Sequence, residues 1–438
     1  MHKADKKGNV INPTSIIALI ILSAVVWCFY SGLFVYGNLQ TGSKANNYFK
    51  NLAVSFKHGR LDIDRSKLET IQDLVIYNGK YYLCWPPVPA IVYMAFTTDS
   101  KDTPDNLIAA SFGTLNAILI TVFLFLFSKR YMLKFRQAEI LFLAVFWTFG
   151  TVHFYMSMIG SVWFIAQIMA QTFLLVSILF MLSGTSPASL LLSSLFYSAA
   201  VYTRNDLVFS AFFLAAIYMK NRGKKWKKYA VKDTLMFALP FICFSALNMA
   251  YNAARFDGRI FDNGLDYHNM DPYLRQNFDE HGYMSVFYIP YNFYTEIIKP
   301  IPVISKFPFF LFSDKGFGFL WASPLFFLVI PAAYYFWAGA KCILTKKAKV
   351  KGPLNRDDIT IMTGAAISWA GTAITIFMIM NNGWAQFASR YSLDFQLMVL
   401  VFILFLLKIW RNWYFYSAAL VLLFISIYIQ YYGVKYFV

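Results

Sequence analysis

Long apolar runs alternate with short polar segments along nearly the whole chain. About 20 apolar residues in a helix cross the ~30 Å hydrocarbon core of a bilayer. We therefore expect an all-α, polytopic transmembrane helical bundle that forms a single domain over residues 1–438. The pattern predicts eleven spans, at residues 14–37, 106–128, 138–157, 163–182, 188–203, 205–219, 234–253, 318–338, 359–380, 393–408 and 413–431.

The charged residues separate into two groups of loops. Lys and Arg gather in the N-terminal leader (Lys3, Lys6 and Lys7) and in the short loops at 129–136, 220–232 and 341–356. Most acids lie in two longer loops, 38–105 and 254–317. Because cytoplasmic loops carry the excess of Lys and Arg, we expect a cytoplasmic N-terminus and two long extracytoplasmic loops. The net charge of +17 follows this loop pattern, so we expect no nucleic-acid partner.

Parts of the two outer loops are apolar but do not have the pattern of a span. Residues 45–57 place aromatic and aliphatic side chains at helical spacing, which predicts an amphipathic surface helix lying in the membrane interface. The sequence YNGKYY at 77–82 predicts a tight Asn-Gly turn. Residues 284–312 are broken by prolines and rich in aromatics, so we expect them to lie at the membrane surface or to dip into it.

The first outer loop carries the candidate catalytic acids. Asp62 and Asp64 follow the predicted surface helix, and Asp73 opens the segment that ends in YNGKYY. A carboxylate held at the outer membrane surface can act as a general base toward an acceptor hydroxyl. The alternative is that these are ordinary solvated loop acids, and that the LDID segment only ends the helix and caps the next turn.

Two arginines are predicted to reach the same outer surface. Arg204 lies in a polar break between the fifth and sixth spans, and Arg390 lies at the outer mouth of the tenth span, one helical turn before Asp394. Guanidinium groups bind phosphate bidentately, so we assign Arg204, Arg390 and Asp394 to substrate binding. The alternative is that the charges only reach out to the interface, or that Arg390 and Asp394 pair with each other.

Further candidates for substrate binding follow the seventh span and the Asn-Gly turn. Asn252, Arg255 and Asp266 lie in the segment YNAARFDGRIFDNGLDY and are expected to line the same cleft, unless they belong to a solvated polar loop. Tyr82 ends the aromatic turn and adds a ring that could stack on a sugar. The four cysteines have no pairing or metal-binding spacing and say nothing about the chemistry. Nothing else in the sequence looks like a metal site, so we expect no strict metal requirement and no cofactor.

Several of these segments, in this order, resemble a known family. They are YFKNLAVSFKHGRLDI, DLVIYNGKYYLCWPPVPAI, TRNDLVF, YNAARFDGRIFDNGLDY, GFGFLWASPLF and GWAQFASRYSLDF. The chain resembles the GT-C superfamily of membrane glycosyltransferases, in the bacterial branch similar to protein O-mannosyltransferases and lipid A aminoarabinose transferases. The resemblance implies a helical bundle with its active site at the extracytoplasmic membrane surface and a polyprenyl-phosphate sugar as donor.

The resemblance also implies a base in the first outer loop, beneath two surface helices. Many relatives carry an Asp-Glu pair directly after the first span, whereas this chain reads LQTGSKANNYF and has no acid there. The role then shifts to Asp62, Asp64 or Asp73, and we favour Asp73 because it opens the segment ending in YNGKYY.

Together these features predict an inverting glycosyltransferase. It would move a sugar from a polyprenyl-phosphate donor to an extracytoplasmic glycan, lipid or protein, for example a lipopolysaccharide or other cell-envelope polysaccharide. One alternative is a polymerase or ligase of lipid-linked glycans, which would also use outer arginines. Another is a flippase or transporter, but transporters place ionisable residues near the membrane midplane, and here such residues map near the ends of the spans.

Overall fold

The structure of the chain, a computed structural model, describes residues 13–42, 46–98, 104–313, 316–345, 353–381, 383 and 386–437, with side chains from residue 20 onward. Lys3, Lys6 and Lys7 of the basic leader, residues 346–352 of the third basic loop and three acids of the outer loops (Asp99, Asp102 and Asp314) lie outside the described residues. The main helices of the bundle are α1 (Pro13–Tyr30), α5 (Asp105–Arg130), α6 (Gln137–Phe149), α8 (Val162–Ser183), α9 (Pro187–Val201), α10 (Ser210–Arg222), α11 (Trp226–Arg255), α15 (Val329–Leu344), α16 (Arg356–Met378), α17 (Leu393–Ile409) and α18 (Trp413–Phe437).

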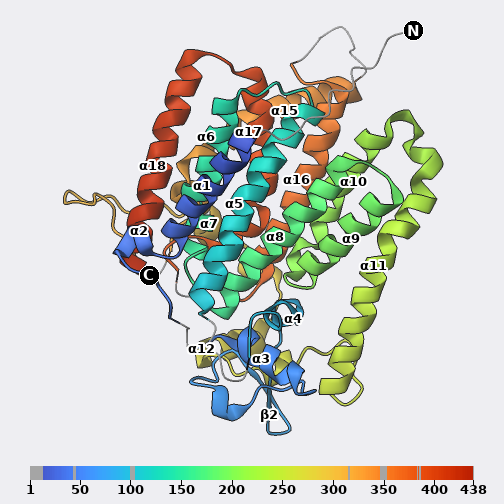
Figure 1. The fold of residues 1–438 in the computed structure, drawn as a ribbon, viewed down its shortest axis with the longest axis vertical. Coiled ribbons are helices and arrows are strands. Elements are labelled where there is room, and N and C mark those ends of the chain that lie inside the picture. The colour runs from blue at the N-terminus through green and yellow to red at the C-terminus, as the bar shows by residue number, and fades with distance from the viewer. Residues whose placement is uncertain are drawn as a thin grey trace.

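Much of this bundle is apolar enough to cross a membrane. Within the described residues, seven helical segments have the necessary length and hydropathy; α6, α9 and the described end of α1 are shorter apolar helices. The segment Asn205–Arg255 counts as one of the seven, but it contains α10 and α11, which run in opposite directions (Figure 1). The predicted helical class is thus confirmed, seven helical segments are long and apolar enough for a membrane protein, and every predicted span overlaps a helix. The number of crossings, eleven, stays a prediction.

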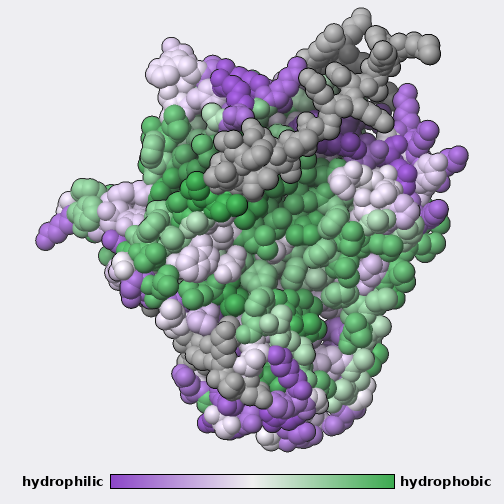
Figure 2. All heavy atoms as spheres, viewed as in Figure 1, coloured by the Kyte–Doolittle hydropathy of each residue, from purple (hydrophilic) through white to green (hydrophobic). Residues whose placement is uncertain are grey.

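The bundle has an apolar belt between two polar ends. Figure 2 shows hydrophobic residues around the middle of the visible face and hydrophilic residues at both ends. Helix α17 is the most enclosed element, since all of its residues from Leu393 to Leu407 are buried. Helix α11 lies at the edge of the bundle, and several of its apolar side chains are exposed, including Val231, Leu235 and Leu247.

A small module formed by parts of the two predicted outer loops, called the outer module below, covers one end of the bundle (Figure 1). It contains α3 (Tyr48–Lys57), the strands β1 (Val75–Tyr77) and β2 (Lys80–Tyr82), α4 (Val88–Tyr93) and α12 (Pro272–His281). The strands pair antiparallel around Asn78 and Gly79, whose φ angles are 49° and 71°. Two positive φ angles are the mark of the tight hairpin that Asn-Gly favours, so the predicted turn is confirmed.

Helix α3 occupies most of the predicted amphipathic segment. Its apolar residues Tyr48, Phe49, Leu52 and Ala53 are at most 2% exposed, because they pack against other parts of the chain. That face is therefore covered by protein. Whether the opposite side of α3 touches the membrane interface stays a prediction.

The two outer loops are joined through the backbone next to Asp73. Its N–H donates to the Asn269 carbonyl at 2.9 Å, and the Asn269 N–H donates to the Leu74 carbonyl at 2.7 Å. An isolated antiparallel bridge between Val75 and His268 continues the contact. Residues nearly 200 positions apart thus form one layer above the bundle.

The proline-broken segment of the second loop forms short helices followed by a hairpin. The short elements include α13 (Ile289–Phe293) and the π-helical turn η6 (Tyr294–Ile298). The hairpin is closed by a bridge between Val303 and Phe310 and projects from the side of the bundle near α18 (Figure 1). Tyr428 of α18 anchors it by donating to the Pro308 carbonyl at 2.9 Å. Insertion of this hairpin into the membrane surface stays a prediction.

Candidate functional site

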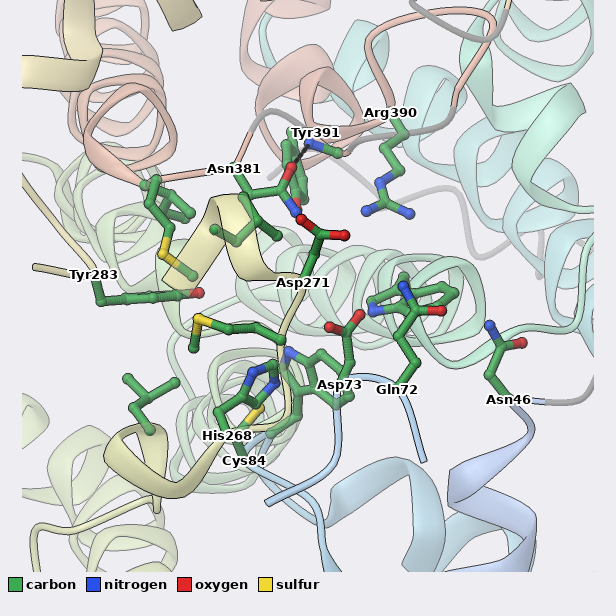
Figure 3. A pocket seen from close by; sticks show the side chains of 18 of the residues that line it. Asn46, Gln72, Asp73, Cys84, His268, Asp271, Tyr283, Asn381, Arg390 and Tyr391 are labelled. Atoms are coloured by element: carbon green, nitrogen blue, oxygen red, sulfur yellow. Dashed lines mark hydrogen bonds between the residues drawn. The ribbon is translucent and has the colours of Figure 1, made fainter. Parts of the chain in front are cut away.

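A cavity of about 400 Å³ lies between the outer module and the adjoining end of the bundle. Figure 3 shows Asp73, Asp271 and Arg390 projecting into it from three different parts of the chain. Its lining residues are Asn46, Gln72, Asp73, Cys84, Trp85, Trp163, Phe164, Arg204, Leu265, His268, Met270, Asp271, Leu274, Tyr283, Ile379, Met380, Asn381, Gly383, Arg390 and Tyr391.

Asp73 sits just before β1, in the layer that joins the two outer loops. Its φ of 59° places it in the left-handed region, which few residues other than glycine adopt. The hydrogen bond to Asn269 fixes this backbone, and the carboxyl group faces the cavity (Figure 3). Burial raises the pKa of Asp73 to about 6, although Arg390 and a hydrogen bond from Trp163 act to lower it. A carboxylate with a pKa in this range suits a general base near neutral pH.

Arg390 begins the short 3₁₀ turn that leads into α17, and it is 4% exposed. Among the described residues it has no acidic partner within 4.0 Å, and its Nε has no hydrogen-bond partner. The rings of Trp163, Phe164 and Tyr391 surround the guanidinium, with centroids 5.8, 5.1 and 5.1 Å away. Aromatic faces attract a cation but do not replace an anion, so the cavity is prepared for a negatively charged group.

Arg204 lines the same cavity but already has carboxylate partners. Its guanidinium lies 2.7 Å from Asp394 and 3.4 Å from Asp206. Asp394 also accepts a hydrogen bond from Gln167 at 3.0 Å and is buried outside the cavity lining. Asp394 therefore holds Arg204 in place. The alternative that Arg390 pairs with Asp394 is wrong, because the carboxylate of Asp394 contacts Arg204 instead.

The remaining candidate acids of the first loop lie outside the cavity lining. Asp64 accepts the Ser66 N–H at 3.0 Å as the cap of a short 3₁₀ turn, and it pairs with the exposed Arg60 at 3.4 Å. This agrees with the capping alternative for the LDID segment. Asp62 is also absent from the cavity lining.

Three of the candidates after the seventh span and the turn, Asn252, Arg255 and Tyr82, form a separate cluster outside the cavity lining. Arg255 is buried, donates to the Leu83 carbonyl and to Asn252, and stacks on Tyr251 at 3.9 Å. Tyr82 packs on Phe256 at 5.6 Å. The expectation that Asn252, Arg255 and Asp266 line the cleft is not met, since none of them, nor Tyr82, is among its lining residues. Arg255, Asn252 and Tyr82 instead hold the exit of the hairpin against the end of α11. Asp266 is exposed, and its backbone oxygen accepts a hydrogen bond from Arg275 at 3.1 Å.

Sequence reasoning missed several residues that line the cavity. Asp271 accepts the Tyr273 N–H at 2.9 Å as the cap of α12, and an Asp-Pro pair before a helix is a recognisable start signal. Trp85 and Trp163 meet edge to face at 6.5 Å. The Nδ1 atom of His268 is buried without a hydrogen-bond partner, and burial together with Arg275 lowers the pKa of this side chain to about 4, so the ring is neutral.

The cavity combines a cation that has no directly contacting carboxylate among the described residues, carboxylates on the facing wall and a pair of indole rings. Such a set can bind an anion, remove a proton and stack on a sugar ring. Among the described residues, no group of three or more His, Cys, Asp or Glu side chains is arranged to hold a metal ion. Comparison with protein-family models, curated proteins and solved structures found no match for this chain.

Proposed function

We propose that this protein is a membrane glycosyltransferase that uses a polyprenyl-phosphate sugar as donor and transfers the sugar with inversion. The observation that carries the proposal is the buried Arg390 guanidinium, which has no acidic partner among the described residues and faces the same cavity as Asp73. A lipid-linked phosphate would neutralise Arg390, and Asp73 would serve as base. The resemblance to GT-C enzymes supports the same assignment.

In this mechanism the donor phosphate lies beside Arg390, with Arg204 on the same wall. Asp73 accepts the proton of the acceptor hydroxyl while that oxygen forms a bond to the anomeric carbon. The bond between this carbon and the phosphate oxygen breaks, and the phosphate leaves with the electron pair. Attack from the face opposite the phosphate inverts the anomeric centre. Placement of the two substrates and neutralisation of the phosphate supply most of the acceleration.

The sugar itself would lie between the two carboxylate-bearing segments and the indoles of Trp85 and Trp163. The acceptor is an extracytoplasmic glycan, lipid or protein, such as a surface polysaccharide. We further propose eleven membrane crossings in the bacterial inner membrane, with the N-terminus in the cytoplasm and the cavity on the outer side. No metal is required in this scheme.

A donor panel tests the proposal directly. Purified protein is incubated with polyprenyl-phosphate monosaccharides and with polyprenyl-diphosphate oligosaccharides, and release of the lipid phosphate is followed by mass spectrometry. We expect turnover of at least one monosaccharide donor, lowered about 10²–10⁴-fold in Asp73→Asn. Turnover of oligosaccharide donors alone would favour the polymerase or ligase alternative, and turnover of neither would refute the transferase assignment.

A further inference from the structure

Glu296 is a buried acid that does not line the cavity. It lies in η6, the π-helical turn of the second outer loop, and is 1% exposed. A buried carboxyl group is costly unless its oxygens are hydrogen-bonded, so its partners indicate why it is there.

Among the described residues, the two hydrogen-bond partners of Glu296 lie in the segment that leads to Arg390. Ser389 donates its hydroxyl to one carboxyl oxygen, and Gln386 donates its side-chain amide to the other at 3.4 Å. The side-chain oxygen of Gln386 in turn accepts the backbone N–H of Arg390 at 3.0 Å. Glu296 is thus connected to the Arg390 backbone in two ways. One is the hydrogen bond from Ser389, the residue before Arg390, and the other is the pair of hydrogen bonds that runs through Gln386.

The surroundings leave this network little room to shift. A Cβ at Gly383, where φ is +95°, would lie 2.7 Å from Oε1 of Gln386. A Cβ at Gly318 would lie 2.4 Å from the backbone oxygen of Ile297, directly beside Glu296. Burial raises the pKa of Glu296 to about 7, against the opposing effect of its hydrogen bonds and of Arg390 and Lys299.

We propose that Glu296 is a positioning residue for Arg390: its carboxyl group holds Gln386 and Ser389 so that the guanidinium points into the cavity. The identity of the anion that Arg390 meets rests on the proposed function, but the positioning itself does not. Arg390 is surrounded by rings and has no acidic partner among the described residues, so its backbone is what fixes its direction.

The first test follows backbone order without any ligand. Hydrogen exchange of the segment 386–392 is measured by mass spectrometry in the full-length protein, in Glu296→Ala, in Glu296→Gln and in Glu280→Ala, a control that removes an exposed carboxylate of the same outer loop. We expect exchange at least tenfold faster in Glu296→Ala only. The glutamine variant is expected to retain order, because its oxygen can accept from Gln386 while its NH₂ donates to the rotated Ser389 hydroxyl.

The second test asks whether Glu296 acts through Arg390. The kcat/KM for the lipid-linked donor is measured in a double-mutant cycle of Glu296→Ala and Arg390→Ala. A misplacement of about 1 Å at a substrate-positioning group costs about 100-fold, so we expect that loss in the parent background and less than a threefold further loss when Arg390 is already alanine. Glu296→Gln should restore activity to within about fivefold of the parent.

The outcomes separate this inference from the proposed function. Unchanged exchange in Glu296→Ala, or an equal loss of activity in both backgrounds, would overturn the positioning role. Faster exchange in a protein that transfers no sugar from any donor would refute the transferase assignment and leave the positioning role standing. If Glu296→Ala does not fold, Ser389→Ala removes one of the hydrogen bonds alone, and unchanged exchange in that variant would overturn the role instead.

Discussion

The two arginines of the cavity differ in their immediate surroundings, and this difference separates their roles. Arg204 has carboxylates at 2.7 and 3.4 Å, whereas Arg390 has three aromatic rings and no acidic partner among the described residues. Removing one member of a buried ion pair leaves the other charge unpaired. Removing Arg390 breaks no such direct pair and takes away only the longer-range attraction that acts to lower the pKa values of Asp73 and Glu296. Arg204 therefore belongs mainly to the folded structure, and Arg390 mainly to ligand binding.

The first prediction compares Arg390→Ala with Arg204→Ala. Arg390→Ala should weaken donor binding at least 100-fold, since a charged hydrogen bond to phosphate contributes about 1.5–3 kcal/mol and several form at once. It should change the melting temperature much less than Arg204→Ala does, because it breaks no direct ion pair among the described residues. Arg204→Ala should lower the stability by about 3–5 kcal/mol because Asp394 becomes unpaired. Donor titration and thermal unfolding in detergent measure both, with the exposed Arg60→Ala as control. Full donor affinity in Arg390→Ala would show that its phosphate assignment is wrong.

The second prediction concerns the three acids of the first outer loop. Asp73→Asn should lower the transfer rate by about 10²–10⁴-fold, which is the usual contribution of a general base, while donor binding and folding are retained. Asp62→Asn and Asp64→Asn are matched controls, since neither lines the cavity, and they should remain within a few-fold of the parent. Rates of all three variants are compared in one detergent preparation. A dead Asp62 or Asp64 variant beside an active Asp73→Asn would move the base to the LDID segment.

The third prediction is a pH dependence that belongs to Asp73. Burial raises the pKa of this carboxyl to about 6, and a general base must be unprotonated. The kcat/KM should therefore be constant above this pKa and fall about tenfold per pH unit below it. The residual kcat/KM of Asp73→Asn, measured over the same pH range, should not fall in this way below about pH 6. If kcat/KM of Asp73→Asn still falls at low pH as in the parent, the titrating group is a residue other than Asp73.

At the scale of elements, the site depends on how two distant loops dock, and this marks the limit of what the sequence could reveal. Charge and turn patterns within one segment were sufficient to select Asp73, Arg204 and Arg390. The hydrogen bonds that join Asp73 and Leu74 to Asn269 connect two separate loops. The residue pattern within one loop cannot predict which distant loop it will contact. For the same reason Arg255 looked available for substrate, although it is engaged with Leu83 from the first loop.

The fourth prediction tests the docking of the loops with two glycines. Gly264 and Gly258 have nearly equal φ angles, +82° and +83°, so alanine at either position has a similar backbone strain of about 1–2 kcal/mol. Only at Gly264 would the new Cβ meet other atoms, at 2.6 Å from Val75 and 2.7 Å from Phe256, whereas nothing lies within 4 Å at Gly258. Gly264→Ala should thus lower the melting temperature and the transfer rate more than Gly258→Ala. Equal effects in thermal unfolding and activity would show that the contact is not needed.

At the scale of the whole molecule, the charge pattern and the architecture agree. The turn between α10 and α11, with its lysines, lies at the end of the bundle opposite the outer module that carries the cavity (Figure 1). The apolar belt of Figure 2 lies between these ends. Composition and hydropathy were enough to predict this arrangement, because each span is specified by its own residues. The shape of the cavity was not predictable, since it forms where many segments meet.

The last prediction places the cavity on the outer side of the membrane. Single cysteines are introduced at Lys224, in the α10–α11 turn, and at Gln276, on α12 beside the cavity, after the four native cysteines have been replaced. Both positions are exposed, so their access to a membrane-impermeant maleimide depends on their side of the bilayer. Because Lys and Arg are retained in cytoplasmic loops, we expect Gln276→Cys to react in intact cells and Lys224→Cys to react only after permeabilisation. The reverse pattern would place Arg390 and Asp73 in the cytoplasm, where an extracytoplasmic acceptor cannot reach them, and would exclude the proposed reaction.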